Sequence, residues 1–334
     1  MINKNMHLNN PFILKPAGKD YLWGGRRLND DFSKGIDMMP LAETWECSTH
    51  PDGPSIVNSG RYKGSFLSDV LQTHPEYLGL HSMSLKELPI LIKFIDAKDD
   101  LSVQVHPDDA YAMAHEKGAN GKTEMWYVMD ASKDAKLIYG LCHTVDRETI
   151  KKGIEEGTFE KYLQKIPVKK NDVFFIEPGT IHAIGAGALI AEVQENSNIT
   201  YRLYDYDRID KTGLKRDLHI EKALDVANLN GIEAPRQNLR VLKYQPGCAV
   251  EFLYRCQYFQ VERMLVNTER IREMVSYATT ELSFEVLLCI DGCGSISFAE
   301  NEILRFFRGD CIFIPASSVS IKIHGNAQFL KVSC

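Results

Sequence analysis

Four residues with metal-ligand chemistry occur in two neighbouring segments and one later turn. Gln104 and His106 stand two residues apart in LSVQVHPDD, Glu124 begins the apolar run EMWYVM, and His182 closely follows the turn PGT. Zinc binds imidazole nitrogen and carboxylate oxygen at about 2.0 to 2.2 Å, and a catalytic site commonly holds three protein ligands beside an open position. The set therefore fits one zinc ion per chain. It would also fit ordinary polar side chains at the mouth of a barrel, and spacing does not decide between these readings.

Strand patterns surround these residues. LSVQVH alternates between apolar and polar positions, so Gln104 and His106 share one face of a strand. Runs rich in Val, Ile, Phe and Tyr, separated by Gly, Pro, Asn and Asp, outnumber helical patterns along the chain. Helical patterns are confined to four segments: 65–73, 108–117, 147–165 with a break near Gly157, and 220–228. The sequence thus predicts a mainly β protein with short helical inserts.

A weak internal repeat predicts the architecture. TEMWYVMDA followed by KKNDVFFIEPGTIHAI resembles FEVLLCIDG followed by RFFRGDCIFIPASSVSI. Each copy is a strand, a polar turn containing Asp172 or Asp310, and a second strand that ends at a proline. This pattern predicts two cupin-like jelly-roll barrels. The stretch ANLNGIEAPRQ lacks strand periodicity, so we expect a metal-binding domain with helical inserts over 1–235 and a C-terminal, metal-free domain over 236–334.

The two copies differ at the positions that would do chemistry. Where the first copy has His182, the second has Val319, and no Gln-x-His pair precedes the second copy. Glu285 aligns with Glu124 but has no histidine at ligand spacing. One barrel is therefore predicted to bind metal and the other to serve as a scaffold.

Composition argues against several classes of function. The 334 residues are 44% hydrophobic and 25% charged with a formal net charge of −6, which is typical of a folded domain. Scattered cations and the absence of a long apolar run argue against nucleic-acid and membrane partners. The first 16 residues lack the apolar centre of a signal peptide, and no CxxC pair occurs. We expect a cytoplasmic monomer or weak homo-oligomer with reduced thiols.

Several segments together resemble the type I mannose-6-phosphate isomerases (phosphomannose isomerases), in their shorter bacterial form. They follow the family's order and span most of the chain; the long helical insert of larger members is shortened here to roughly 144–165. The matching segments are KPAGKDYLWGG (15–25), AETWECS (42–48), LPILIKFIDAKDDLSVQVHPDD (88–109), GKTEMWYV (121–128), FIEPGTIHAIGAGALIAEVQENSNITYRLYDYDR (175–208) and the repeat at 284–315.

The resemblance implies a role for individual residues. The zinc ligands would be the four residues identified first. Arg202 matches an arginine that the family places against the reacting end of the sugar, and Glu192 and Lys122 match residues debated as proton carriers. Ser102 and Arg208 match the positions that hold the phosphate; the family often has lysine at the latter.

The implied reaction interconverts mannose 6-phosphate and fructose 6-phosphate by moving a proton between C1 and C2 through an enediol. An arginine fork can stabilise the developing oxyanion, and binding of the remote phosphate can hold the reacting carbons in place. The proton carrier stays open among Glu192, Lys122, a zinc-bound water and an acid/base pair. Burial on an apolar strand is expected to raise the pKa of Glu192.

Two other functions are compatible with the same residue types. A metal cupin of another class, such as an oxygen-dependent dioxygenase, also uses His and Glu, although it commonly has a site suited to redox-active iron. A catalytically silent sugar-phosphate sensor would keep the pocket without turnover. The Gln-x-His, Glu and His set with an arginine and a phosphate-binding cation favours isomerisation over the dioxygenase. The presence of Arg202, Glu192 and Lys122 argues against a silent sensor.

Overall fold

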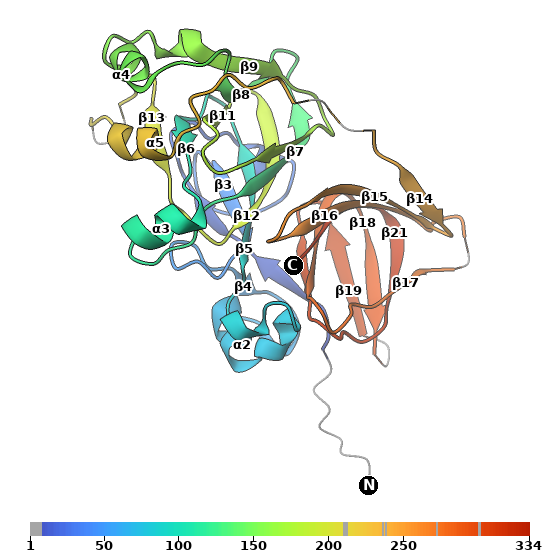
Figure 1. The fold of residues 1–334 in the computed structure, drawn as a ribbon. Coiled ribbons are helices and arrows are strands. Elements are labelled where there is room, and N and C mark those ends of the chain that lie inside the picture. The colour runs from blue at the N-terminus through green and yellow to red at the C-terminus, as the bar shows by residue number, and fades with distance from the viewer. Residues whose placement is uncertain (1–8, 210–212, 236, 238, 272, 300–301) are drawn as a thin grey trace.

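The computed structural model describes residues 9–209, 213–235, 237, 239–271, 273–299 and 302–334. Residues 1–8, which are half of the N-terminal segment that lacks a signal-peptide pattern, lie outside these ranges. Arg236, the predicted first residue of the second domain, also lies outside them. The described chain forms two β bodies side by side (Figure 1). No described helix is long and apolar enough to cross a membrane. The division of the chain at residue 235 stays a prediction.

The first body contains two antiparallel sheets, and the larger one carries Glu124. In order across this sheet, its strands are β10 (Val173–Ile176), β7 (Glu124–Ala131), β12 (Ala188–Glu195), β5 (Ile90–Asp96), β3 (Glu43–Cys47) and β2 (Ala17–Lys19). Every residue of β12, β5 and β3 is buried. These strands are covered on both faces, so the charged residues within them, such as Glu46, Lys93 and Glu192, are buried as well.

The second sheet of this body carries the two histidines. Its strands are β13 (Tyr201–Tyr204), β6 (Val103–Val105), β11 (His182–Ile184), β8 (Lys136–Leu141) and β9 (Leu163–Pro167). A buried cluster joins the two sheets, with Trp126 and Ile190 from the larger and Leu137 and Ile184 from the smaller. This two-sheet packing agrees with the predicted jelly-roll architecture.

Helices pack on the outer face of the smaller sheet, where α4 and α5 bury Ile150 and Ala223 in one cluster with Val103 and Val105. The α-helices are α1 (Arg27–Asp30), α2 (Leu67–Thr73), α3 (Asp109–His115), α4 (Arg147–Glu155) and α5 (Ile220–Val226), with short 3₁₀ turns at Gly60–Tyr62, Pro75–Leu78, Met83–Leu85 and Phe159–Tyr162. Because Val103 and Val105 face the helices, the intervening Gln104 faces the other sheet.

One predicted helix is too long. The pattern over 147–165 predicts a helix with a break, but α4 ends at Glu155 and a strand, β9, begins at Leu163. Gly157 adopts a positive φ of 67°, which ends the helix, and the following residues pair with β8. The other three helices form where predicted, with shorter bounds.

The second body is built on a ten-stranded antiparallel sheet. Its main order is β14 (Leu242–Gln245), β15 (Cys248–Arg255), β16 (Gln260–Asn267), β21 (Ile321–Ser333), β18 (Glu285–Phe298), β20 (Cys311–Ile314), β1 (Phe12–Lys15) and β4 (Ile56–Val57), with β17 (Val275–Tyr277) on β21 and β19 (Glu302–Phe307) on β18. Phe12 lies opposite Phe313, so a strand from the beginning of the chain completes the sheet made by its end. The first strand of the described chain therefore belongs to the second body, although most of the following chain belongs to the first.

The internal repeat is confirmed at the level of strand register. Glu124 in β7 lies opposite the last residue of β10, and Glu285 in β18 lies opposite the last residue of β20. In each intervening turn, the side chain of Asp172 or Asp310 accepts a hydrogen bond from the backbone N–H three residues earlier, at 3.0 and 2.8 Å. The two copies thus share the pairing of their first and last strands and the aspartate turn before the last strand, although β8, α4 and β9 lie between these strands in the first copy and β19 in the second.

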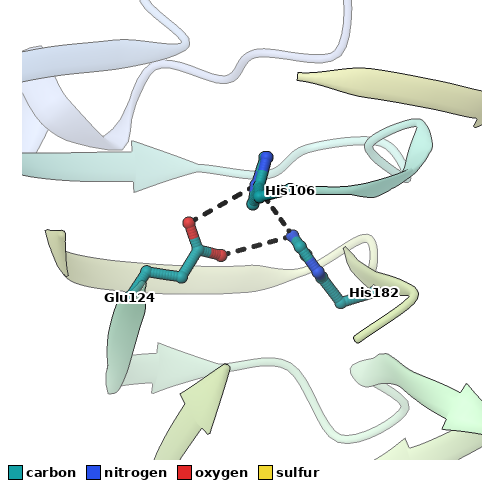
Figure 2. A group of neighbouring side chains, drawn as sticks. All are labelled: His106, Glu124 and His182. Atoms are coloured by element: carbon teal, nitrogen blue, oxygen red, sulfur yellow. Dashed lines mark hydrogen bonds and ion pairs between the residues drawn. The ribbon is translucent and has the colours of Figure 1, made fainter. Parts of the chain in front are cut away.

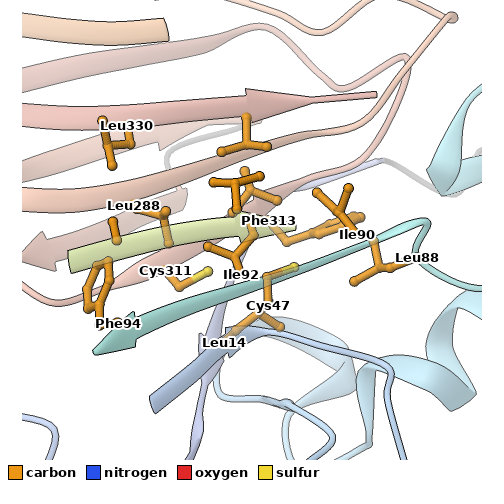
Figure 3. Close-up of a cluster of buried hydrophobic side chains, with 14 of the residues drawn as sticks. Leu14, Cys47, Leu88, Ile90, Ile92, Phe94, Leu288, Cys311, Phe313 and Leu330 are labelled. Atoms are coloured by element: carbon orange, nitrogen blue, oxygen red, sulfur yellow. The ribbon is translucent and has the colours of Figure 1, made fainter. Parts of the chain in front are cut away.

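A large apolar interface holds the two bodies together. Ile92 and Phe94 on the outer face of the six-stranded sheet belong to one buried cluster with Leu288, Phe313 and Leu330 of the second body (Figure 3). The second body therefore covers the face of the sheet that points away from the metal ligands. This supports the scaffold role predicted for it.

A buried ion pair lies at the same interface. The Lys34 ammonium is 2.7 Å from Glu46, and these side chains are 3% and 0% exposed. Lys34 also donates to the carbonyl of Gly309 in the second body, and Thr44 donates to the Glu46 carboxylate. Burial raises the pKa of Glu46 although Lys34 opposes the shift. The carboxylate therefore depends on this one lysine.

Replacing Lys34 with methionine should lower the free energy of unfolding by about 3 to 5 kcal/mol, because a buried carboxylate would lose its cation. Urea denaturation of the mutant and of Lys133→Met, at an exposed turn, provides the measurement and its control. A loss no larger than that of the control would contradict the importance of the pair.

Candidate active site and metal centre

Three predicted metal ligands converge between the two sheets (Figure 2). His106 directly follows β6, Glu124 begins β7 and His182 begins β11. The Nε2 atoms of the two histidines are 3.2 Å apart, and the Glu124 carboxylate oxygens lie 3.6 Å from His106 and 3.3 Å from His182. One ligand atom from each residue lies within 4.8 Å of the others. Among the described residues, this is the group of His, Cys, Asp and Glu placed to hold a metal ion.

Burial keeps the two imidazoles in the form that binds metals. His106 is 1% exposed and His182 is fully buried. Burial lowers the pKa of His182 to about 4, and burial together with Lys122 lowers the pKa of His106 well below 6.5. The Nδ1 atom of His182 lies 2.8 Å from the Thr180 carbonyl, to which it donates. That bond leaves Nε2 as the lone-pair atom facing the group.

The carboxylate of Glu124 fits a cation. Both of its oxygens are buried; Oε2 lies 2.9 Å from the Lys122 ammonium, and Oε1 accepts no hydrogen bond from a described residue. Burial, reinforced by Glu192, raises its pKa to about 7 although Lys122 opposes the shift. A divalent ion would stabilise the ionised form of this buried carboxylate. Together with the two neutral imidazoles, Glu124 forms the His₂Glu set of catalytic zinc sites.

Gln104 borders the same group. Its Nε2 lies 3.4 Å from Nε2 of His182, and its backbone lies directly opposite His182 in the sheet. The amide nitrogen and oxygen have the same shape, so rotating the amide by half a turn presents the oxygen instead. Gln104 is therefore placed to serve as a fourth, weaker ligand.

Lys122 lies beside the ligands. Its ammonium is 2.9 Å from Oε2 of Glu124 and 3.2 Å from Nε2 of His106, and its side chain is 4% exposed. The ammonium thus touches two atoms that a metal ion would use. Lys122 also reaches the cavity described next, as expected for a group near the reacting atoms.

A cavity of about 280 Å³ adjoins the metal group. Of the residues predicted from the sequence, Ser102, Gln104, Lys122, Glu192 and Arg202 all line it. The other lining residues are Tyr21, Trp23, Glu43, Lys93, Ile95, Leu101, Ile184, Asn198, Thr200 and Arg216. Most of the predicted site is therefore brought together in one polar space.

Glu192 has a different charge state from the one expected. Lys93 lies 3.0 Å from one carboxylate oxygen and the Trp126 indole donates to the other at 2.9 Å. Burial would raise the pKa of Glu192, but Lys93 and Lys122 outweigh it and lower the pKa to about 2. The expected upward shift is therefore wrong, because the strand sequence does not show which cation lies opposite Glu192.

Arg202 connects the metal end of the cavity with Ser102. It lies opposite Gln104 in the sheet, so Arg202, Gln104 and His182 form one row across three strands. Its Nε atom donates to the Ser102 hydroxyl at 3.3 Å, and Nη1 donates to the Asp217 carbonyl at 2.7 Å. These bonds fix the guanidinium while leaving Nη2 for a ligand.

Arg208 is not among the described residues that line the cavity. Its guanidinium donates to the carboxylate and carbonyl of Asp205 and to the carbonyl of Asp100. Arg216 reaches the cavity instead. Arg216 takes the place predicted for Arg208 because the segments that carry the two arginines run antiparallel, with Ile209 bridged to Lys215. The spacing along the sequence does not show which of the two arginines faces the cavity.

Two further charged cavity residues were missed. Lys93 and Glu43 lie on β5 and β3, and both side chains are buried. The charged residues within the strand-like runs ILIKFID (Lys93 and Asp96) and AETWEC (Glu43 and Glu46) were the available signal, because a charge is rarely buried in a strand unless it is paired. Lys93 pairs with Glu192 on the neighbouring strand β12, whereas Glu43 accepts a hydrogen bond from the indole of Trp45 on its own strand at 2.8 Å.

Glu285 occupies the place of Glu124 in the second body. It lies 4.0 Å from the Lys331 ammonium, and burial raises its pKa to about 7. Val319 stands at the position of His182. The metal-free character of this body stays a prediction.

Comparisons with known proteins give a consistent result. The family model for the phosphomannose isomerase type I catalytic domain matches residues 12–134, and that for the mannose-6-phosphate isomerase cupin domain matches 249–334. A probable mannose-6-phosphate isomerase of Bacillus subtilis is 44% identical over 325 residues, covering 97% of this chain and 99% of that protein. The mannose-6-phosphate isomerase of Streptococcus mutans is 44% identical, covering 96% and 97%.

A solved structure supports the same relationship. The crystal structure of the mannose 6-phosphate isomerase from Bacillus subtilis superposes with a TM-score of 0.87 at 33% identity, covering 97% of this chain and 99% of that one. Phosphomannose isomerase from Salmonella typhimurium shares the fold at 15% identity, with a TM-score of 0.75. The predicted mainly β fold with a cupin domain is thus confirmed, and the chain belongs to the type I mannose-6-phosphate isomerase family.

Proposed function

We propose that this chain interconverts mannose 6-phosphate and fructose 6-phosphate through an enediol, with one zinc ion per chain. The observation that carries the proposal is the buried His106, Glu124 and His182 group beside a cavity lined by Arg202 and Glu192. Full-length relatives with mannose-6-phosphate isomerase names support the same reaction. The free state of all eight cysteines agrees with the cytoplasmic location expected from the sequence.

Gln104, His106, Glu124 and His182 would hold the zinc. When bound, zinc supplies a Lewis acid that polarises or orients sugar oxygens. Catalysis also requires groups that move the proton, stabilise the oxyanion and hold the phosphate.

Arg202 is the proposed oxyanion-stabilising group. Its two bonds to Ser102 and the Asp217 carbonyl orient the guanidinium before the sugar arrives. Preorganised cations are most effective where charge develops during the reaction. Its position in one row with the proposed ligands Gln104 and His182 supports a role at the reacting end of the sugar.

Glu192 is the proposed proton carrier. Its side chain lines the cavity beside the metal group, which supports the role. Lys93 and Lys122 lower its pKa to about 2 against the effect of burial, so Glu192 is ionised but is a weak base until the substrate changes its surroundings. Lys93, in contact with the same carboxylate, can compensate the charge that changes during transfer. Lys122 is the alternative carrier, because its ammonium also lies in the cavity beside the metal group.

Ser102 and Arg216 are the proposed phosphate-binding pair. Both line the cavity, and the Ser102 hydroxyl also accepts a hydrogen bond from Arg202. The sequence match had paired Ser102 with Arg208, whose donors are instead used by Asp205 and Asp100. A phosphate held by Arg216 and Ser102 would accept charge-assisted hydrogen bonds from the guanidinium and a further bond from the hydroxyl.

Chelation should abolish fructose 6-phosphate formation from mannose 6-phosphate, and added zinc should restore it, because the buried ligands cannot replace the ion. A coupled assay on purified protein before chelation, after it and after zinc addition gives the measurement. Full turnover by the metal-free protein would contradict the zinc requirement. A zinc-loaded protein that binds the sugar phosphate without turnover would indicate a sensor, and dependence on iron and oxygen a dioxygenase.

A further inference from the structure

One buried carboxylate connects the two arginines near the phosphate end of the cavity. Asp205 is 5% exposed. Its oxygens accept hydrogen bonds from Nε and Nη2 of Arg216 at 2.8 and 2.5 Å, and from Nη2 of Arg208 at 2.5 Å. Bidentate binding of a guanidinium by a carboxylate fixes both the position and the plane of the arginine fork.

Arg208 is the second arginine that binds Asp205. It bonds the side chain and the backbone carbonyl of Asp205, the latter at 3.2 Å, and also the carbonyl of Asp100 next to the cavity residues Leu101 and Ser102. All three nitrogens of Arg208 thus bind protein atoms. Arg208 therefore holds the carboxylate of Asp205 through contacts that do not involve Arg216.

Arg216 is the member of the cluster that reaches the cavity. Its contacts with Asp205 use Nε and Nη2 and leave Nη1 outside the carboxylate pair. Arg202, also at the cavity, bonds the carbonyl of Asp217, the residue after Arg216. Two guanidinium groups thus bind one buried carboxylate, with Arg202 bonded to the residue that follows Arg216, and a phosphate dianion would neutralise the remaining positive charge.

We infer that Asp205 is a positioning residue, which holds the Arg216 fork at the cavity so that it receives the substrate phosphate. This inference rests on the proposed function, because it assigns the phosphate to the Arg216 side of the cavity. Asp205 itself does not line the cavity among the described residues and lies outside the metal group. Its effect should therefore appear in substrate binding rather than in the chemical step.

Replacing Asp205 with asparagine should raise the KM for mannose 6-phosphate and the inhibition constant of inorganic phosphate by about tenfold each. The neutral amide no longer balances two guanidinium groups, so the Arg216 fork must be ordered by the ligand itself. The kcat value should stay within about threefold of the wild-type value, because the substrate, once bound, meets the same metal and proton carrier. Bound zinc should be unchanged.

Asp207→Asn is the matched control. Asp207 is 76% exposed and pairs with Lys215 at 2.7 Å, and its removal should leave KM and the phosphate inhibition constant unchanged. If Asp205→Asn does not fold, Arg208→Gln provides a second route, since it loosens Asp205 without removing the carboxylate. It should raise KM less than Asp205→Asn would, again with kcat retained. Unchanged KM in a folded Asp205 or Arg208 variant, or a loss confined to kcat, overturns the inference.

Failure of the inference can be distinguished from failure of the proposed function. An active wild-type enzyme with unchanged KM in Asp205→Asn overturns the positioning role and leaves the isomerase standing. If the wild-type protein does not isomerise the sugar, calorimetric titration with inorganic phosphate decides the role of Asp205. Binding that weakens in Asp205→Asn but not in Asp207→Asn supports it, and equal or absent binding overturns it.

Discussion

Replacing His106 with alanine should remove bound zinc and isomerase activity together. Two strong ligands, Glu124 and His182, would remain, and they cannot complete the three-ligand set of a catalytic zinc site. Because each ligand must be present in its deprotonated form at a fixed position, loss of one weakens metal binding rather than merely changing its geometry. The measurements are zinc content by elemental analysis and turnover of mannose 6-phosphate on the same sample.

His115→Ala is the control for this experiment. His115 ends helix α3 on the surface and stacks on Tyr111. It should keep one zinc per chain and normal turnover. A His106→Ala protein that retains stoichiometric zinc would show that the ligand set is wrongly assigned, even if activity were lost.

The metal group could be predicted because its geometry is set locally. Alternation along β6 places Gln104 and His106 on one side, and the repeat places Glu124 at the start of a buried strand. The broken repeat identified His182 by the contrast with Val319. Strand periodicity and a comparison within the chain identified these residues, because neither depends on contacts between distant segments. They did not decide between a metal site and ordinary polar side chains at a barrel mouth, and the resemblance to the family favoured the metal site.

The rest of the cavity depends on contacts between distant segments. The pairing of Lys93 with Glu192 is made across β5 and β12, and it reverses the pKa shift expected from burial. Which of Arg208 and Arg216 reaches the cavity depends on the antiparallel pairing of Ile209 with Lys215. Neither pattern is visible along the sequence, because the partner of each charge lies on another strand or after a reversal of the chain.

The shared sheet was missed for a similar reason. A domain boundary drawn once along the sequence assigns β1 to the first unit, whereas β1 pairs with β20 in the sheet of the second. The sequence of β1, FILK, does not show which strand it will pair with. Apolar pattern predicts that a strand is buried, but pairing also depends on which edge is open when the bodies pack.

Replacing Arg202 with alanine should keep the zinc and the fold while lowering kcat at least about a hundredfold, which corresponds to about 2.7 kcal/mol. Arg202 is not a predicted ligand, and the atoms it bonds are the Ser102 hydroxyl and one backbone carbonyl, so its loss removes little from the core. What is removed is a fixed cation in one row with Gln104 and His182. Steady-state kinetics, zinc content and thermal unfolding measured on one preparation test each part of this expectation.

The contacts of Arg202 also allow the two ends of the substrate to be separated. Its Nε atom reaches Ser102, so a role confined to the phosphate would raise KM and leave kcat near normal. That result would remove Arg202 from the chemical step and assign it to the phosphate with Arg216. A fall in kcat, partly recovered in Arg202→Lys because lysine keeps the charge but not the fork, would place Arg202 against the developing oxyanion. Comparing the two variants thus measures how much of the effect comes from charge and how much from the fixed direction of the guanidinium.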